Sequence, residues 1–278
     1  MTHRNNIVDI IRGFAMLLVV LGHTISGSTV EYEVTFLFQL IWTLQMPLFI
    51  IVSGYVTRYS KPIDSAGKLW GYVRKRTLAY LLPWAAWTFF VRGLLFHQTA
   101  FFNLKYLFWH MDNGYWFLIT IWTINMLYLC ADYMSNKITM KAGANLLWHL
   151  VFCICGMAAL AVVGYLAGFS FFSIKLTLYY IPFYLLGFLY GRLQERVLSY
   201  KNGPQLLEVA VAVSLAAWIG LITRFDFFTA SGAVMVGLRF VTSALGCCAV
   251  IGLFTAYRRN LWGGVFSSGP ENILWKSI

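Results

Sequence analysis

Residues 7–27 read IVDIIRGFAMLLVVLGHTISG, an apolar run long enough to cross a bilayer that also contains an arginine and a histidine. Ionisable side chains are rare in membrane spans and usually mark a site or a partner. Arg12 and His23 are eleven positions apart, which places them within about 20° of each other around a helix and about 16 Å apart along it. The run therefore predicts a membrane helix with two functional groups on one face.

The whole chain has the composition of a membrane protein. Hydrophobic residues make up 60% of its 278 residues and charged residues only 11%, and the mean hydropathy is +0.70. A soluble domain of this length is less apolar and carries more charge. The segments long enough to span a bilayer are Ile7–Gly27, Thr35–Val56, Thr77–Phe96, Tyr115–Met134, Ala144–Gly168, Leu176–Gly191, Leu206–Ile222 and Ala230–Tyr257. We therefore expect an all-α, polytopic transmembrane helix bundle of about eight spans.

The net charge of +11 reflects membrane topology rather than nucleic-acid binding. Most basic residues lie beside the termini or in the connections after even-numbered spans: Arg4, Arg58, Lys61, Lys68, Arg74, Lys75, Arg76, Lys137, Lys141, Arg192, Arg196, Lys201, Arg258 and Arg259. The odd-numbered connections hold only Lys105, Lys175 and Arg224. Because positively charged loops stay on the cytoplasmic side, we expect both termini to be cytoplasmic in an inner or plasma membrane.

Neither a cleaved leader, nor a disulfide scaffold, nor a metal site is expected. A short basic lead before an apolar stretch loosely fits a signal peptide, but Arg12 and His23 would interrupt its apolar region. The cysteines match no zinc spacing and all fall within expected spans: Cys130, Cys153, Cys155, Cys247 and Cys248. They are most simply small apolar residues of the helices.

Motifs in several spans carry a family resemblance. In the first span, Asp9-x-x-Arg12-Gly13-Phe14-Ala15 is followed by His23, with ten residues between the arginine and the histidine. Further motifs follow in order: Pro47-Leu48-Phe49 with Ser53-Gly54-Tyr55, Arg74-Lys75-Arg76 before Pro83, Trp116-Phe117-Leu118, and Pro182-Phe183-Tyr184 with Leu186-Gly187. Together, over roughly residues 7–257, they resemble the acyltransferase-3 family of integral membrane O-acyltransferases, in its fucose 4-O-acetylase-like branch.

The resemblance implies transfer of an acyl group, usually acetyl, from cytoplasmic acetyl-CoA to a hydroxyl of a cell-surface sugar or glycan precursor. His23 would be the catalytic base, because a neutral imidazole can take the proton of an attacking hydroxyl. Arg12, Arg74, Lys75 and Arg76 would bind the phosphates of the acyl-CoA. No cofactor beyond this donor substrate is required. The expected substrate-pocket residues are Ser53, Tyr55, Trp116 and Arg92.

Each candidate also has a purely structural explanation. Arg12 could be a snorkelling anchor paired with Asp9. His23 could hydrogen-bond a neighbouring helix. The basic cluster at residues 74–76 could serve topology alone, and Trp116 suits an interfacial aromatic belt. The remaining span-associated histidines are expected at the membrane interface: His97, His110 and His149.

A transporter or flippase of a lipid-linked sugar or small anion is the rival function. It would use Arg12, Arg92 and Arg239 along a polar route, since charges inside spans should face a cavity or a partner. The partners of Arg92 and Arg239 do not follow from the sequence. Short, glycine-interrupted helix pairs in matching halves would favour a transporter, and the sequence shows no such symmetry.

The chain departs from the family pattern at its C-terminal end. We expect one membrane-embedded domain over residues 1–257 and a short polar tail over 258–278, with fewer spans than members of the family typically have. Glycine and proline in this tail, at Gly263–Gly264 and Gly269–Pro270, should end any helix there. The chain therefore looks shortened relative to the family.

Overall fold

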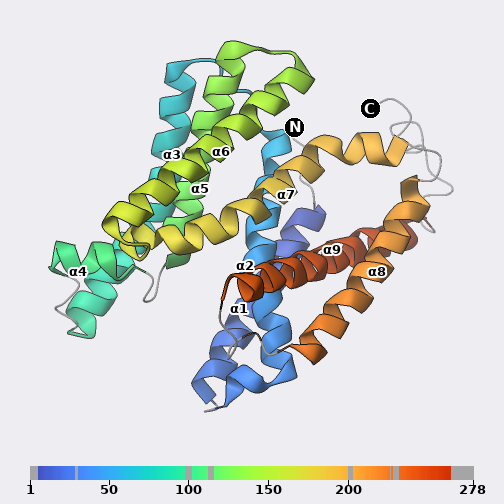
Figure 1. Cartoon of the computed structure of the whole chain (residues 1–278), viewed down its shortest axis with the longest axis horizontal. Helices are drawn as coiled ribbons and strands as arrows, with labels where there is room; N and C mark the ends of the chain where they lie inside the picture. The colour runs from blue at the N-terminus through green and yellow to red at the C-terminus, as the bar shows by residue number, and fades with distance from the viewer. Residues whose placement is uncertain are drawn as a thin grey trace. The chain divides into compact units, whose positions relative to one another are not determined.

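The computed structural model describes residues 6–28, 31–97, 102–111, 116–199, 203–225, 227 and 232–263. Within these ranges all regular structure is helical, as Figure 1 shows. The elements are α1 (Asn6–Ser28), η1 (Tyr32–Val34), α2 (Phe36–Val56), η2 (Thr57–Tyr59), α3 (Ala66–Ala85), η3 (Ala86–Leu95), α4 (Leu104–Trp109), α5 (Trp116–Ile138), α6 (Ala142–Ala167), η5 (Phe171–Ser173), α7 (Ile174–Ser199), α8 (Gly203–Arg224) and α9 (Ala233–Gly263). The all-α prediction is confirmed.

Eight helical segments in this part of the chain are long and apolar enough to cross a membrane, as predicted. The protein is therefore a multi-pass membrane protein. The start of the third span was predicted wrongly. The third span begins at Ala66 rather than Thr77, because the Ser65 hydroxyl caps the helix by accepting from the Lys68 amide at 3.4 Å. The last candidate span, Ala233–Thr255, ends close to the predicted Tyr257, and its helix continues to Gly263; the rest of the expected polar tail lies outside the described residues.

The second half of the third span is a π-helix over Ala86–Leu95. Pro83, just before it, lacks the amide hydrogen that an α-helix would use, which weakens the regular hydrogen-bond pattern at that point. The wider coil ends where the Phe96 amide donates to the Val91 carbonyl at 3.0 Å, five residues back. Such segments are rare and often lie at functional sites.

The contacts divide the chain into two compact units. The first comprises Met1–Arg58 and Leu185–Ile278, and so contains α1, α2, the second half of α7, α8 and α9. The second unit comprises Tyr59–Tyr184 and contains α3 to α6 and the start of α7.

In the first unit, α1 packs lengthwise on α2 (Figure 1). The buried positions of α1 recur at steps of three and four, which places them on one stripe of the helix. They are Val8, Ile11, Ala15, Leu18 and Gly22. Phe14 on the side of this stripe meets Phe254 of α9, with ring centroids 5.4 Å apart. One face of α1 is therefore packed against other helices of the unit, and its remaining positions are partly or fully exposed.

Two glycines on α7 allow close helix packing in the same unit. A methyl group on Gly187 would lie 2.8 Å from the carbonyl carbon of Ile51, and one on Gly191 would lie 3.0 Å from the carbonyl oxygen of Tyr55. Their spacing of four residues puts both on one face of α7, against the backbone of α2. This is the small-residue packing by which membrane helices approach closely.

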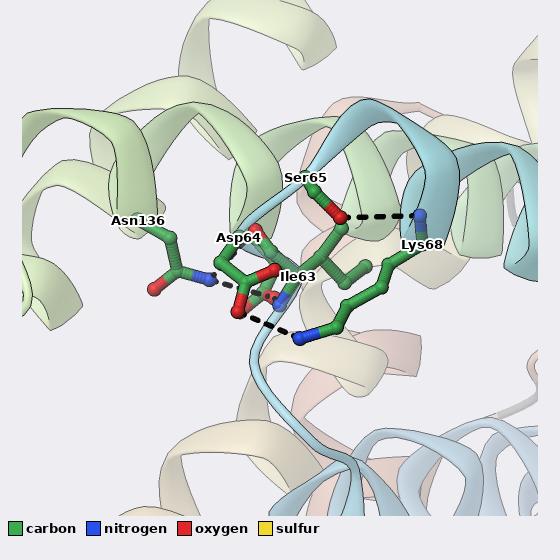
Figure 2. Close-up of polar contacts among 6 residues, drawn as sticks. Ile63, Asp64, Ser65, Lys68 and Asn136 are labelled. Atoms are coloured by element: carbon green, nitrogen blue, oxygen red, sulfur yellow. Dashed lines mark hydrogen bonds and ion pairs between the residues drawn. The ribbon is translucent and has the colours of Figure 1, made fainter.

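In the second unit, a polar network fixes the connection that leads into α3 (Figure 2). The carboxylate of Asp132 on α5 is buried and accepts from the Ile63 amide and from Asn136 Nδ2, both at 3.0 Å. Asn136 Nδ2 also donates to the Ile63 carbonyl at 3.3 Å. The neighbouring Asp64 pairs with Lys68 Nζ at 2.6 Å. Both the amide and the carbonyl of Ile63 are therefore hydrogen-bonded to side chains of α5.

Candidate active site

Arg12 and His23 lie together on one flank of α1, outside its buried stripe. The helix is continuous from one to the other, so the predicted geometry of about 20° around and about 16 Å along the axis applies. Both side chains are exposed. Among the described residues, neither forms a hydrogen bond or an ion pair, so no pairing of Arg12 with Asp9 is present in this structure. Both side chains are thus accessible along one path on this helix.

The residue next to His23, Gly22, packs tightly against side chains of α2. A methyl group on Gly22 would lie 2.6 Å from Gln45 Oε1 and 3.3 Å from Ile41 Cγ2 of α2. Gln45 Oε1 is buried and has no hydrogen-bond partner within the described part of the chain. The amide end of Gln45 therefore sits in the helix interface directly beside the backbone that carries His23.

Arg239, a charge predicted inside the last span, has an aromatic partner that the sequence did not identify. Its guanidinium carbon lies 5.9 Å from the centroid of the Trp42 ring on α2. A guanidinium over an indole face is stabilised by the ring quadrupole, and this helps to keep the charge within a span. Nearby on α2, Thr43 Oγ1 accepts from Trp218 Nε1 of α8 at 3.1 Å. These polar contacts link α2, α8 and α9.

Ser53 and Tyr55, two expected substrate-pocket residues, use their hydroxyls within the protein. Ser53 Oγ donates to the Phe49 carbonyl one turn earlier, at 2.8 Å. Tyr55 Oη donates to Gln194 Oε1 on α7 at 3.0 Å, and Arg58 Nη1 donates to the same oxygen at 2.8 Å. Their role in the pocket stays a prediction, and the structure shows that Tyr55 joins the ends of α2 and α7.

The expected acyl-CoA cluster lies on a helix rather than in a loop. Because successive residues of a helix point about 100° apart, Arg74, Lys75 and Arg76 leave α3 in three directions. Arg74 and Lys75 are exposed. Arg76 is half-buried and its Nη1 donates to Tyr80 Oη at 3.5 Å, one turn along α3. The three charges therefore do not form a single patch on one face.

The two other expected pocket residues also belong to the second unit. Trp116 at the start of α5 stacks on Tyr180 of α7, with centroids 5.4 Å apart and planes 14° apart. Arg92 is half-buried within the π-helix, where Gly93 packs against the ring of Phe102. One face of the Trp116 ring is therefore covered by protein, and its other face is the one that a substrate could contact.

Comparison with known proteins decides the family. The acyltransferase-3 family, described as an acyltransferase domain, matches residues 5–275. This chain belongs to that family. It is also similar to the nodulation protein NolL of Sinorhizobium fredii, with 27% identity over 204 residues, which cover 69% of this chain and 50% of the relative. The chain thus spans about half the length of that curated relative. No solved structure matches the chain significantly.

Two buried groups of this acyltransferase-family chain were not singled out from the sequence. Asp132 lies inside the fourth span, and an acidic residue in a span is itself a signal of a site or a partner. His149 was expected at the membrane interface, and its depth in the membrane stays a prediction. The structure shows that its ring is buried on α6, 5.1 Å from that of Tyr128 on α5.

Proposed function

We propose that this protein is a membrane O-acyltransferase that moves an acetyl group from acetyl-CoA to a hydroxyl of a cell-surface sugar or glycan precursor. The observation that carries the proposal is the pair Arg12 and His23, both exposed on one flank of one membrane helix. Membership of the acyltransferase-3 family supports acyl transfer as the reaction class. The loop charges favour cytoplasmic termini, which would place Arg12 near the cytoplasmic donor.

His23 is suited to the proton transfer of this reaction. A neutral imidazole accepts the hydroxyl proton while the hydroxyl oxygen attacks the thioester carbonyl carbon. A carbon–oxygen bond forms and the carbon–sulfur bond breaks, so the acyl group leaves the thiol and becomes an ester. The imidazolium then returns the proton to the departing thiolate, which yields free CoA thiol and neutral His23.

The basic residues are suited to the donor. Arg12 presents a guanidinium, which can bind two phosphate oxygens at once, and it lies near the N-terminal end of α1. Arg74 and Lys75 are exposed on α3 and are the members of the basic cluster that an approaching phosphate would meet first. Arg76, half-buried and hydrogen-bonded to Tyr80, would contribute a third positive charge to phosphate binding.

The test of the base assignment is acetyl transfer by His23→Ala. The variant should lose transfer by about 100-fold or more, while expression and membrane insertion stay close to wild type. His110→Ala is a matched control, because His110 is exposed and its ring stacks on Tyr106, away from any proposed step. If purified, correctly inserted His23→Ala keeps most of its activity, His23 is not the base.

The test of the donor site is equilibrium binding of acetyl-CoA to the detergent-purified protein. Arg12→Gln and Arg74→Gln should each weaken binding, and added salt should weaken the exposed Arg74 contribution more than that of Arg12. Arg224→Gln, at the end of α8, serves as the charge-matched control. A transporter of a lipid-linked sugar has no need of CoA. If the wild-type protein binds neither acetyl-CoA nor CoA, the acyltransferase proposal fails.

A further inference from the structure

The buried amide of Gln45 points to a ligand beside the proposed base. Its Oε1 has no hydrogen-bond partner within the described ranges, and a buried polar atom of this kind calls for an explanation, of which a bound ligand is one. The amide fits into the α1–α2 interface because Gly22 has no side chain at that point. His23 is the next residue of α1. A group that satisfied Gln45 would therefore lie within one residue of the backbone that carries the imidazole, with the Gly22 and His23 positions about 100° apart around α1.

A hydroxyl group fits this position best. Oε1 accepts hydrogen bonds and so requires a donor. If the amide were turned over, Nε2 would take its place and require an acceptor. A hydroxyl both donates and accepts, so it can satisfy Gln45 in either orientation. Because a hydroxyl has a single proton, the one that donates to Oε1 would be a neighbour of the hydroxyl that His23 deprotonates in the proposed reaction.

The same face of α2 offers an aromatic surface for the ring that carries the hydroxyl. Trp42 precedes Gln45 by three residues, so the two side chains leave α2 on neighbouring positions of one face. The Trp42 ring is half-buried and has the guanidinium of Arg239 5.9 Å from its centroid. Indole rings pack well against the C–H faces of sugar rings, because both surfaces are apolar while the sugar hydroxyls remain at the edge.

We propose that Gln45 and Trp42 bind the sugar acceptor, Gln45 through a hydroxyl that neighbours the reacting one and Trp42 through the sugar ring. Arg239 acts as a positioning residue, because it holds the Trp42 ring through the cation–π contact. This inference rests on the proposed function and deepens it by placing acceptor recognition on α2, beside the base of α1. The phosphates of the donor are assigned to Arg12 and the basic residues of α3, so acetyl-CoA affinity is expected not to depend on Gln45 or Trp42.

The experiment separates acceptor binding from donor binding and from chemistry. Para-nitrophenyl α-L-fucopyranoside is a suitable probe, because its ring has secondary hydroxyls and an apolar face. Its binding to the purified protein is measured by equilibrium dialysis without donor, and its KM and kcat are measured with saturating acetyl-CoA. Gln45→Met removes the amide at similar volume. Trp42→Phe shortens the aromatic surface. Gln205→Met and Trp148→Phe are controls at exposed positions.

Gln45→Met should raise the glycoside Kd and KM about five-fold, the factor expected for one net hydrogen bond, and leave acetyl-CoA affinity unchanged. Trp42→Phe should raise both by a similar or larger factor. Arg239→Leu should raise KM more than Arg239→Lys, since lysine keeps a cation over the ring, whereas a merely structural role would lower the amount of folded protein and leave KM unchanged.

The outcomes distinguish the two proposals. If wild type binds the glycoside but transfers no acetyl group to it, the proposed function is contradicted and the acceptor site stands. If wild type and Gln45→Met bind the glycoside equally, the acceptor assignment is wrong whether or not transfer occurs. A wild-type protein that does not bind the glycoside also contradicts the acceptor assignment, and weaker acetyl-CoA binding in Gln45→Met would assign the amide to the donor instead.

Discussion

Gly187→Ala should strongly destabilise the packing of α7 on α2. The new methyl group would lie 2.8 Å from the Ile51 carbonyl carbon and 3.0 Å from the Tyr55 amide nitrogen. Both are backbone atoms, so no side-chain rotation can make room and the two helices must separate. Overpacking of this kind costs about 1–3 kcal/mol or more. In an open helix the same substitution is favourable by about 0.5–1 kcal/mol.

The matched control is Gly220→Ala on α8, where a methyl group would meet nothing within 4 Å. The two variants have the same change in composition and in helix propensity, so the difference in their stability isolates the contact. We expect Gly187→Ala to be less stable than Gly220→Ala by about 2–4 kcal/mol.

Thermal unfolding in detergent can be followed with a thiol-reactive fluorophore: the exposed Cys130, Cys155 and Cys248 set the starting signal, and the buried Cys247 and Cys153 become reactive on unfolding. The apparent Tm of Gly187→Ala should fall by several degrees. That of Gly220→Ala should stay at or above the wild-type value. Equal midpoints for the two variants would refute the close approach of α7 to the α2 backbone.

Three other predictions follow from the polar contacts and the topology. Asp132→Ala should lower the free energy of unfolding by about 3–5 kcal/mol, because it removes two hydrogen bonds to a buried carboxylate. Asp132→Asn keeps an acceptor for the Ile63 amide and should lower it by about half as much. Denaturant unfolding that finds the asparagine variant less stable than the alanine variant would contradict this. The hydrogen bond from Lys68 lowers the pKa of Asp64. The stability difference between wild type and Asp64→Asn should therefore be present at neutral pH and vanish as the pH falls through that lowered pKa, and melting curves at several pH values with a constant difference would argue against it. Reporter fusions after Glu33 should score as external and those in the connection between α2 and α3 as cytoplasmic; reversed scores would separate Arg12 from cytoplasmic CoA.

Much of the membrane architecture could be predicted from composition and run length. Spans were recognisable because a bilayer demands about 20 apolar residues in a row, a local property of the chain. The start of α3 was harder to predict. Residues 66–76 are too polar to stand out as a span, and a serine cap together with contacts to α5 lets the helix begin there. The basic cluster at residues 74–76 was therefore predicted in a connection but lies on a helix in the structure.

The candidate site shows the same division. Arg12 and His23 could be proposed from spacing alone, because both belong to one helix and helical geometry is known in advance. Gln45, Trp42 and Arg239 could not be grouped in this way. Gln45 is an ordinary polar residue in sequence, and its significance comes from an amide oxygen buried without a partner against Gly22.

The amino-acid sequence by itself determined that this is a multi-pass helical membrane protein of the acyltransferase-3 family with an arginine and a histidine on one helix face. Periodicity and hydropathy carry that information because they depend only on neighbours along the chain. Tertiary structure alone decided which polar groups from different helices meet. It paired Arg239 with Trp42, and anchored Ile63 to Asp132. Such contacts depend on how the helices pack, because packing alone brings residues far apart in sequence within reach of one another.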